Sequence, residues 1–420
     1  MKSIETICFE AKQASKILAI SATDTKNRFL EILAEWLESH HDRIRNANKL
    51  DVMDGKKAEL TPALIDRLTL TESRIVGVAT DLRHVCSLPD PVGEVFDRSQ
   101  LYQGLNVRKQ RVPLGVLAVI YESRPNVTID VTALAVKSGN AIVLRGGKET
   151  IRTNKVLIEG IQETLAKAGL PSTAAQFISE PDRHYVKTLL KMHKHIDMLI
   201  PRGGSSLHQY CRENSTIPVI TGGIGICHLF VDKSADQSKS LQVIRNAKIQ
   251  RPTVCNALDT VLVHESIADE FIPVLIEELQ KDGVQFKLDD NAFNCVEKDF
   301  SQCIKKAGQY DFDTEWLSLV LGVRVVDGFE MAVAHIAKHS THHSDGILTG
   351  DEENAKRFTT LVDSAAVYVN ASTRFTDGAQ LGLGAEVAIS TQRLHARGPM
   401  ALRELTTYKW VIEGDFAVRE

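Results

Sequence analysis

One of the seven cysteines lies where a nucleophile would be useful. Cys255 belongs to the segment IQRPTVCNALDTVLVH, between the end of an expected helix and the start of an expected strand, and Arg251 precedes it by four positions. A cationic neighbour favours the thiolate, which is the reactive form of cysteine. The local context leaves two interpretations open, a nucleophilic thiol and a packed, inert one. The other six cysteines lie in helical, apolar or poorly patterned segments and are expected to be buried or incidental.

Three short glycine-rich turns follow expected strands and are candidates for binding phosphate. They read LRGGKE, IPRGGSSL and ITGGIG. In the second turn, Gly203, Gly204 and Ser205 lie between an apolar strand and a helix, where backbone N–H groups and the helix dipole attract anions. A tight turn without a ligand is the alternative for each loop. In the first turn Glu149 follows Lys148, where a nucleotide-triphosphate loop needs a hydroxyl, and this argues against a kinase.

Four histidines near residue 340 raise the question of a metal site. His335 and His339 are four positions apart on an expected helix, and His342 and His343 follow. Zinc proteases carry a glutamate directly after the first histidine of such a pair, and Ile336 stands at that position here. We therefore expect no metal and interpret the histidines as a solvated helix end.

The composition excludes several classes of protein. The chain has 420 residues, too many for one compact core, so more than one domain is expected. Charged residues make up 25% and the formal net charge is −4, with no polybasic block, so nucleic acid is not an expected partner. No apolar run reaches the roughly 20 residues that cross a bilayer, and the first residues lack a secretory signal. The cysteines are scattered, without a C-x-x-C pair, which indicates a reducing, cytoplasmic setting.

The elements that must position these residues can be read from periodicity. Up to about residue 90 the apolar residues recur at helical spacing, and Thr61-Pro62 has the form of a helix cap followed by its first residue. Residues 93–101 and 105–113 then alternate like the two arms of a hairpin, and residues 406–415 form another strand-like arm. These arms have no obvious partner within a domain, so we expect them to pair with another subunit.

From residue 115 onward, strand-like and helix-like segments alternate. Residues 115–121 and 141–145 are continuous apolar runs, and helical patterns over 127–137 and 150–168 follow them. Continuous runs are typical of a parallel sheet that is covered on both faces. A second series of the same kind begins near residue 230. The sequence therefore predicts an α/β, doubly wound architecture in two domains.

Several longer motifs carry a resemblance to a known family. They occur in this order: VPLGVLAVIYESRPNVTIDVTALAVKSGNAIVLRGGKE, QRPTVCNALDTVLVH, THHSDGI, VYVNAST and LGLGAEVAISTQRLHARGPMAL. Together they resemble the gamma-glutamyl phosphate reductases, a family of the aldehyde dehydrogenase superfamily, and the resemblance runs nearly end to end. It implies an aldehyde dehydrogenase-like fold with two α/β domains and a small β oligomerisation element. The implied domains are cofactor-binding (1–93 and 112–230), catalytic (231–403) and the oligomerisation arms (94–111 and 404–420).

The family reduces L-glutamyl 5-phosphate to L-glutamate 5-semialdehyde and phosphate with NADPH, the second step of proline biosynthesis from glutamate. By resemblance, Cys255 is the nucleophile that forms a thioester, and Asn126 in ESRPNVT donates to the oxyanion. The cofactor residues that the resemblance implies are Arg145, Lys148, Gly203, Gly204, Ser205 and Glu315. Lys148 stands where many NAD-using relatives have a glutamate, so NADP(H) is the expected cofactor. Three arginines suit the anionic substrate: Arg124, Arg251 and Arg374.

One departure from the wider superfamily bears on the reaction. Hydrolytic aldehyde dehydrogenases carry a glutamate directly before a Gly-Gly pair, where it activates water, and Thr221 stands there in this chain. An acyl-phosphate reductase needs no such base. The alternative functions are a non-phosphorylating semialdehyde or pyrroline-carboxylate dehydrogenase and a non-enzymatic NADP-binding scaffold. The expected partners are a small-molecule substrate, further copies of the chain and, transiently, glutamate 5-kinase, with no membrane.

Overall fold

A computed structural model describes residues 2–101, 104–222, 224–296 and 302–419, and of Ala63 the backbone only. The chain divides into two compact units. Unit 1 consists of residues 1–221, 382–388 and 400–420, and unit 2 of residues 222–381 and 389–399. Each unit is described separately below.

Unit 1 opens with a layer of helices. Its helices are α1 (Ile4–Leu18), α2 (Thr23–Ser39), α3 (His41–Lys57), α4 (Pro62–Leu68) and α5 (Glu72–Ser87). In α2 the side chains of Phe29, Leu33 and Leu37 recur on one face and are almost fully buried, as their spacing predicts. Thr61 accepts a hydrogen bond from the backbone N–H of Leu64, so the predicted cap of α4 is confirmed.

The sheet of unit 1 has four parallel strands in the order β5-β4-β3-β6. The strands are β3 (Val116–Tyr121), β4 (Ala141–Arg145), β5 (Ala175–Phe177) and β6 (Met198–Arg202), and the helices between or after them are α6 (Val127–Lys137), α7 (Ile151–Ala168), α8 (Arg183–Leu189) and α9 (Ser205–Asn214). The strand residues of β3 and β4 are all buried, which explains their continuous apolar runs. Because these strands are parallel, the loops that follow β3, β4 and β6 leave from the same edge of the sheet.

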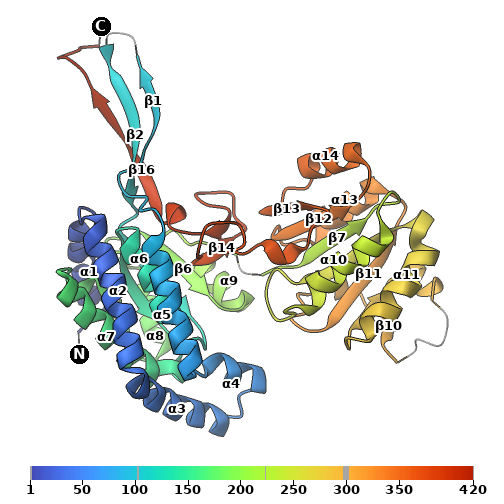
Figure 1. Cartoon of the computed structure of the whole chain (residues 1–420), viewed down its shortest axis with the longest axis horizontal. Helices are drawn as coiled ribbons and strands as arrows, with labels where there is room; N and C mark the ends of the chain where they lie inside the picture. Colours follow the sequence, from blue (N-terminus) through green and yellow to red (C-terminus); the bar gives the residue numbers. More distant parts are fainter. Residues whose placement is uncertain (1, 102–103, 223, 297–301, 420) are drawn as a thin grey trace. The chain divides into compact units, whose positions relative to one another are not determined.

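A three-stranded antiparallel arm extends from unit 1. Strands β1 (Val95–Gln100) and β2 (Asn106–Pro113) form the predicted hairpin, and β16 (Thr406–Glu413) lies along the other side of β2 (Figure 1). The register of β16 runs from Thr406 opposite Pro113 to Glu413 opposite Asn106. The expectation that the arms have no partner within a domain is therefore wrong, and their pairing with another subunit stays a prediction. The two strands lie almost 300 residues apart in the sequence, so no local pattern could reveal their pairing.

Unit 2 is built on a seven-stranded parallel sheet in the order β10-β9-β11-β8-β7-β12-β13. Its strands are β7 (Cys227–Val231), β8 (Leu258–His264), β9 (Gln285–Leu288), β10 (Ile304–Lys306), β11 (Val320–Val326), β12 (Ser344–Leu348) and β13 (Ala366–Val369). Its helices are α10 (Gln237–Ile249), α11 (Glu265–Gln280), α12 (Asp290–Asn294), α13 (Phe329–His339) and α14 (Glu352–Leu361). Two short strands, β14 (Ala388–Ser390) and β15 (Gly398–Met400), pair where the chain passes between the units.

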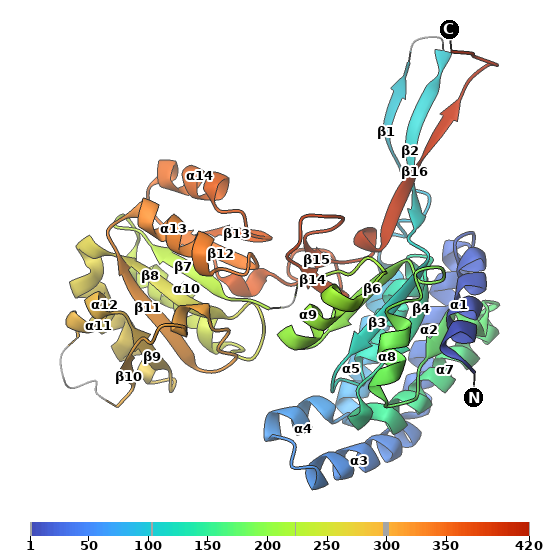
Figure 2. The ribbon, with the colours of Figure 1, turned by 180° about the vertical axis from the view of Figure 1, so that it is seen from behind.

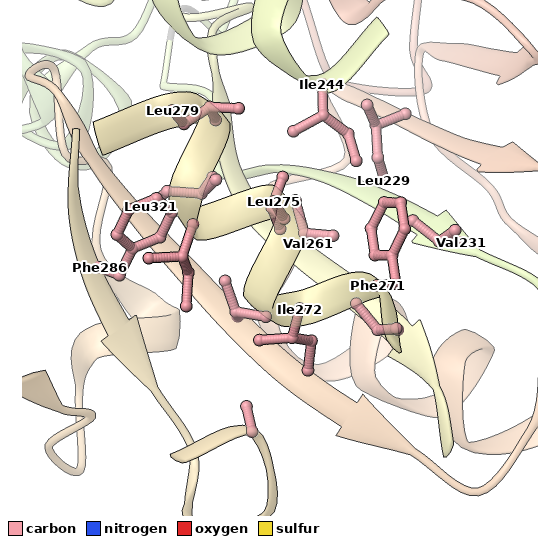
Figure 3. Packing of buried hydrophobic residues seen from close by; sticks show 14 of the residues in the cluster. Leu229, Val231, Ile244, Val261, Phe271, Ile272, Leu275, Leu279, Phe286 and Leu321 are labelled. Carbon is pink, nitrogen blue, oxygen red and sulfur yellow. The ribbon is translucent and has the colours of Figure 1, made fainter. Parts of the chain in front are cut away.

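Helices cover both faces of this sheet. On one face Leu229, Val261 and Leu321 pack against Phe271 and Leu275 of α11 (Figure 3). On the other face Phe230, Leu262 and Ile347 pack against α13 and α14, which Figure 2 shows from behind. Neighbouring residues of one strand thus enter opposite cores, which explains why no polar alternation marks these strands in the sequence.

The domain boundaries differ from those expected. The prediction ended the cofactor domain at residue 230, but β7 pairs with β8 and β12 and so belongs to unit 2. Residues 382–388 and 400–403, placed in the catalytic domain by prediction, group with unit 1. The apolar run at 217–221, which reads as a strand, contributes only one isolated bridge, between Val219 and Leu199. In the part of the chain that the structure describes, no helix is both long and apolar enough to cross a membrane.

Candidate active site

The predicted site residues of unit 1 collect at the carboxyl edge of its sheet. Arg124 and Asn126 follow β3, Lys148 follows β4, and the Gly203-Gly204 pair joins β6 to α9. Carboxyl edges of parallel sheets are where α/β folds bind ligands, because several loops and helix N-termini meet there. The sheet order places β3 between β4 and β6, so the Asn126 loop lies between the two glycine-rich loops.

The Asn126 loop is tied to the first glycine-rich loop by Glu149. One oxygen of this carboxylate, Oε1, accepts hydrogen bonds from the backbone N–H of Ser123 at 3.0 Å and from its hydroxyl at 2.6 Å. Ser123 has a φ of +42°, which a residue other than glycine adopts only where its surroundings hold it. A Cβ atom at Gly147 would lie 2.3 Å from the same Oε1, so a side chain there would displace the Glu149 carboxylate from this position. Glu149 therefore couples the loop of Lys148 to the loop of Asn126.

Asn126 itself is the N-cap residue of α6, and its side chain turns along the first turn of the helix. Its amide nitrogen Nδ2 donates to Oδ2 of Asp130 at 2.8 Å. Asp130 was not singled out from the sequence, where an acid in the first turn of a helix reads as a complement to the helix dipole. No signal in the sequence separates that reading from a contact with Asn126.

Arg145 and Lys148 differ in exposure. Lys148 is exposed beyond the end of β4, whereas Arg145 is buried, and burial lowers its pKa. The Arg145 guanidinium donates to the carbonyl oxygens of Gly146 and of Pro181, the latter at 2.8 Å. Its Nε has no hydrogen-bond partner among the described residues. A buried donor without a partner carries a desolvation cost, which a ligand acceptor would offset.

The start of α9 is open to a ligand. Gly204 is its N-cap residue and supplies no side-chain acceptor, so the first-turn N–H groups receive no cap from it. A Cβ atom at Gly204 would meet nothing within 4 Å, and both Gly204 and Ser205 are exposed. One turn further, burial and, to a smaller extent, Arg202 together lower the pKa of His208 to about 4. These observations fit a phosphate group at the helix N-terminus.

Cys255 lies in unit 2 at the amino edge of the sheet, in the loop that leads into β8. The residue is half-buried, and its carbonyl oxygen accepts a hydrogen bond from Sγ of Cys227 at 3.2 Å. A Cβ atom at Gly225 would lie only 1.5 Å from the same carbonyl oxygen. Gly225 thus permits the segment before β7 to pack against the backbone of Cys255. The sequence predicts that this glycine belongs to a candidate phosphate-binding turn, ITGGIG, and Gly223 of that turn lies outside the described residues.

Two of the three predicted substrate arginines lie with Cys255. Burial lowers the pKa of Arg374, the Arg251 guanidinium lowers it further, and Asp377 and Cys255 act in the opposite direction. Nε of Arg374 donates to Oε1 of Gln250 at 2.8 Å. The backbone carbonyl of Arg374 accepts from the side chain of Asn256, the neighbour of Cys255, at 3.3 Å. Arg251 is exposed and Cys255 is half-buried, so this part of unit 2 is partly open to solvent.

Glu315 belongs to the same part of unit 2. Its Oε1 accepts a hydrogen bond from the backbone N–H of Gly225 at 2.9 Å. The pKa of Glu315 is raised to about 7: burial raises it most, the hydrogen bond from the Gly225 N–H opposes this, and Asp259 adds to the rise. Glu315 is therefore placed against the segment that packs on Cys255, and its carboxyl group titrates near neutral pH. Its predicted role at the nicotinamide ribose remains a prediction.

The histidines of α13 are not a solvated helix end, and that interpretation is wrong. His335 and His339 are buried, and their rings lie 4.4 Å apart between centroids. His335 also meets the ring of His228 on β7, whose Nδ1 lies 2.9 Å from Oδ1 of the buried Asp345. The histidines face the sheet because α13 turns its apolar stripe toward it. Among the described residues, no group of three or more His, Cys, Asp or Glu side chains has the arrangement to hold a metal ion.

The structure thus brings the predicted residues together in two groups. Arg124, Asn126 and the first two glycine-rich loops belong to unit 1. Cys255, Arg251, Arg374, Glu315 and the glycines of the third loop belong to unit 2. Nothing in the sequence indicated a functional role for Asp130, Glu149 or Gln250, or the close approach of Gly225 to the backbone of Cys255.

Comparisons with known proteins show which family the chain belongs to. Residues 1–294 match the model of the aldehyde dehydrogenase family. The gamma-glutamyl phosphate reductase of Psychromonas ingrahamii is 56% identical over 409 residues, which cover 97% of this chain and 98% of the relative. That of Escherichia fergusonii is 53% identical over 416 residues, covering 99% and 100%. The crystal structure of the gamma-glutamyl phosphate reductase of Thermotoga maritima is 44% identical, with a TM-score of 0.96 and 99% of both chains covered. The chain therefore belongs to the aldehyde dehydrogenase family and, within it, groups with the gamma-glutamyl phosphate reductases.

Proposed function

We propose that this chain reduces L-glutamyl 5-phosphate to L-glutamate 5-semialdehyde and phosphate with NADPH, the second step of proline biosynthesis from glutamate. The names of its relatives support this reaction. The observation that carries the proposal is that Arg374 of unit 2 lies close enough to both Cys255 and Arg251 for their charges to act on its pKa. A nucleophilic thiol beside two guanidinium groups suits an acyl group whose leaving group is phosphate.

In the proposed mechanism, the thiolate of Cys255 attacks the acyl carbon of the substrate. The bond from this carbon to the phosphate oxygen breaks, phosphate leaves, and a thioester forms on the Cys255 sulfur. The side-chain amide of Asn126 and the backbone N–H of Cys255 stabilise the negative oxygen that develops during this step. One such donor is typically worth about 2.7–4 kcal/mol of transition-state stabilisation. After hydride reaches the thioester carbon, the thiohemiacetal collapses and releases the aldehyde and the Cys255 thiolate.

NADPH supplies the hydride, and the residues of unit 1 fit such a cofactor. The N-terminus of α9 with Gly203, Gly204 and Ser205 would hold the pyrophosphate. The exposed ammonium group of Lys148 would attract the 2′-phosphate, and the unpartnered Nε of Arg145 would serve the adenosine end. Glu315 would hold the nicotinamide ribose.

The three arginines divide the work of holding the anionic substrate. Arg251 and Arg374 lie in the same part of unit 2 as Cys255, where the phosphate of the substrate must leave. We therefore assign the binding of this phosphate to the two arginines. The Gln250 side chain accepts from Nε of Arg374, and the terminal nitrogens of this guanidinium group would bind the anion. Arg124, two positions before Asn126 in the sequence, is then the candidate for the carboxylate at the far end of the substrate.

A second function, the non-phosphorylating semialdehyde dehydrogenase, has one observation in its favour. Thr221 offers no carboxylate for activating water, but Glu315 lies against the Gly225 segment with its pKa raised to about 7. A carboxylate of that pKa is suited to act as a general base, which is typically worth about 10²–10⁴-fold. The two functions differ in what attacks the thioester in the oxidative direction, phosphate or water.

The deciding experiment measures NADPH formation from glutamate semialdehyde and NADP⁺ at pH 7 to 8, with and without phosphate. The reductase predicts turnover that depends on phosphate or arsenate. Sustained turnover without either anion, with glutamate as product, would establish the non-phosphorylating reaction. Cys255→Ala should abolish both while leaving cofactor binding intact, and Cys295→Ala, a half-buried cysteine of the same unit, is the matched control.

The partners and setting follow from the same proposal. The chain acts on a small-molecule substrate in the cytoplasm and assembles as a homo-oligomer, with glutamate 5-kinase as a transient partner that supplies the labile acyl phosphate. The seven cysteines all lie among the described residues and form no disulfide, in keeping with a reducing compartment.

A further inference from the structure

The side chain of Asn126 has a partner that the proposed mechanism does not use. Its Nδ2 donates one hydrogen to Oδ2 of Asp130 at 2.8 Å, across the first turn of α6. An amide nitrogen carries two hydrogens, whereas an ionised carboxylate can only accept. An ionised Asp130 therefore requires that the nitrogen, and not the oxygen, of the Asn126 amide faces it. The second hydrogen of the same nitrogen stays available for another acceptor.

We propose that Asp130 is a positioning residue that fixes the orientation of the Asn126 amide, so that its second N–H is presented to the oxyanion. This inference rests on the proposed function, in which Asn126 is an oxyanion donor. With Asp130 protonated, its O–H can donate to the amide oxygen of Asn126. The amide can then turn over and present its oxygen to the oxyanion, which would repel it. Only the ionised form of Asp130 holds the productive orientation.

The surroundings of Asp130 set the pH at which this control operates. The pKa of Asp130 is raised to about 7 as the net result of burial, which raises it most, the hydrogen bond from Asn126, which lowers it, Asp81 of α5, which raises it, and Arg202 at the end of β6, which lowers it. Asp81 is itself affected, because burial raises its pKa and His84 lowers it. The orientation of Asn126 should therefore respond to pH in the neutral range. Since the ionised form is required, kcat should rise with pH through about 7 and level off above.

The first test measures kcat and KM from pH 5.5 to 9 for the wild type, Asp130→Asn and Asp130→Glu. In Asp130→Asn the neutral side chain can pair with either end of the Asn126 amide. We expect its kcat to fall by about tenfold or more, part of the 10²–10³-fold that loss of an oxyanion donor costs, with KM little changed. The rise of kcat with pH near pH 7 should be absent in Asp130→Asn and present again in Asp130→Glu. A wild-type pH profile in Asp130→Asn would overturn the proposal.

Asp81→Asn provides a readout that a purely structural role would not move. Removing the negative charge of Asp81 should lower the pKa of Asp130. The rise of kcat should therefore shift to lower pH, while the maximal kcat at high pH is retained. If kcat rises at the same pH as in the wild type, another group controls this pH dependence, which would contradict the proposal. This variant also covers the case in which Asp130→Asn does not fold.

Asn126→Ala separates failure of this inference from failure of the proposed function. Full activity in Asn126→Ala would remove Asn126 from the mechanism and with it the basis for a positioning partner. If Asn126→Ala is impaired, adding Asp130→Asn should cost little more, because the amide that Asp130 orients is already absent. If the kcat losses of the two single variants instead multiply in the double variant, the inference is contradicted, but the role of Asn126 is unaffected.

Discussion

At the scale of single residues, Lys148 is the one whose charge bears most directly on cofactor choice. Its side chain is exposed directly after β4. Lys148→Glu places a negative charge where the 2′-phosphate of NADP(H) is proposed to lie, so it should weaken NADP(H) much more than NAD(H). Fluorescence titration with both cofactors measures this difference. Lys155→Glu, an exposed lysine on α7, is the control with the same charge change, and equal losses for both cofactors in Lys148→Glu would contradict the assignment.

Gly225 shows how one missing side chain supports the nucleophile. A Cβ atom there would fall 1.5 Å from the carbonyl oxygen of Cys255, and neither backbone segment can yield as a flexible side chain would. Gly225→Ala should therefore displace Cys255 and reduce kcat by about tenfold or more, because small misplacements of reacting groups are costly. The rate of Cys255 alkylation reports the same displacement.

The matched control for this change is Gly77→Ala on α5, where an added Cβ meets nothing within 4 Å. This substitution should leave activity unchanged and should stabilise the helix by about 0.5–1 kcal/mol, since alanine is the better helix former. Full activity and unaltered alkylation in Gly225→Ala would mean that the close approach of the two backbones is not needed.

At the scale of elements, the histidines of unit 2 predict a dependence of stability on pH. Burial lowers the pKa of His335 to about 2, and it lowers the pKa of His343 to about 4. In the unfolded chain both titrate near 6.5, so below that pH the unfolded state binds more protons than the folded state. Above about pH 6.5 these two histidines should not reduce the free energy of unfolding. It should fall as the pH drops toward 4, by up to about 1.4 kcal/mol per pH unit for each group.

Urea denaturation at pH 7, 6 and 5 measures this slope. His335→Gln should unfold with a shallower pH dependence than the wild type, whatever its stability at pH 7. His184→Gln, which changes an exposed histidine of α8, should leave the slope unchanged. Identical slopes in the wild type and His335→Gln would show that His335 is not held neutral by the fold.

The elements also show what the sequence could and could not predict. Helix α6 and strand β4 begin and end at the predicted residues, and α7 begins one residue later than predicted, because periodicity and caps are local properties. The pairing of β16 with β2 was missed because it joins residues almost 300 positions apart. The contact of Asp130 with Asn126 and that of Glu149 with Ser123 were missed for another reason. They depend on side-chain directions in loops and first turns, and residue type alone does not specify these directions.

At the scale of the whole molecule, the arm raises the question of assembly. In the order β1-β2-β16 the strand β16 forms one edge, and its eight residues have β2 as their only strand neighbour among the described residues. Tyr408, Trp410 and Ile412 alternate along it and are 46%, 56% and 60% exposed. The ammonium group of Lys109 lies 4.7 Å and 4.9 Å from the ring centroids of Tyr408 and Trp410. A long edge with a row of exposed large side chains is an aggregation hazard unless another chain covers it.

We therefore predict that the chain forms a dimer or larger homo-oligomer through this arm, with β16 as the contacting strand. Light scattering at micromolar concentration should give at least twice the mass of one chain. The double change Trp410→Ser with Ile412→Ser should shift the mass toward the monomer, because it removes the apolar surface that association would bury. Val418→Ser is the control, since Val418 is 75% exposed but lies beyond the strand. A fully active wild-type monomer at this concentration would exclude assembly through the arm, and an unchanged oligomer in the double variant would place the contact elsewhere.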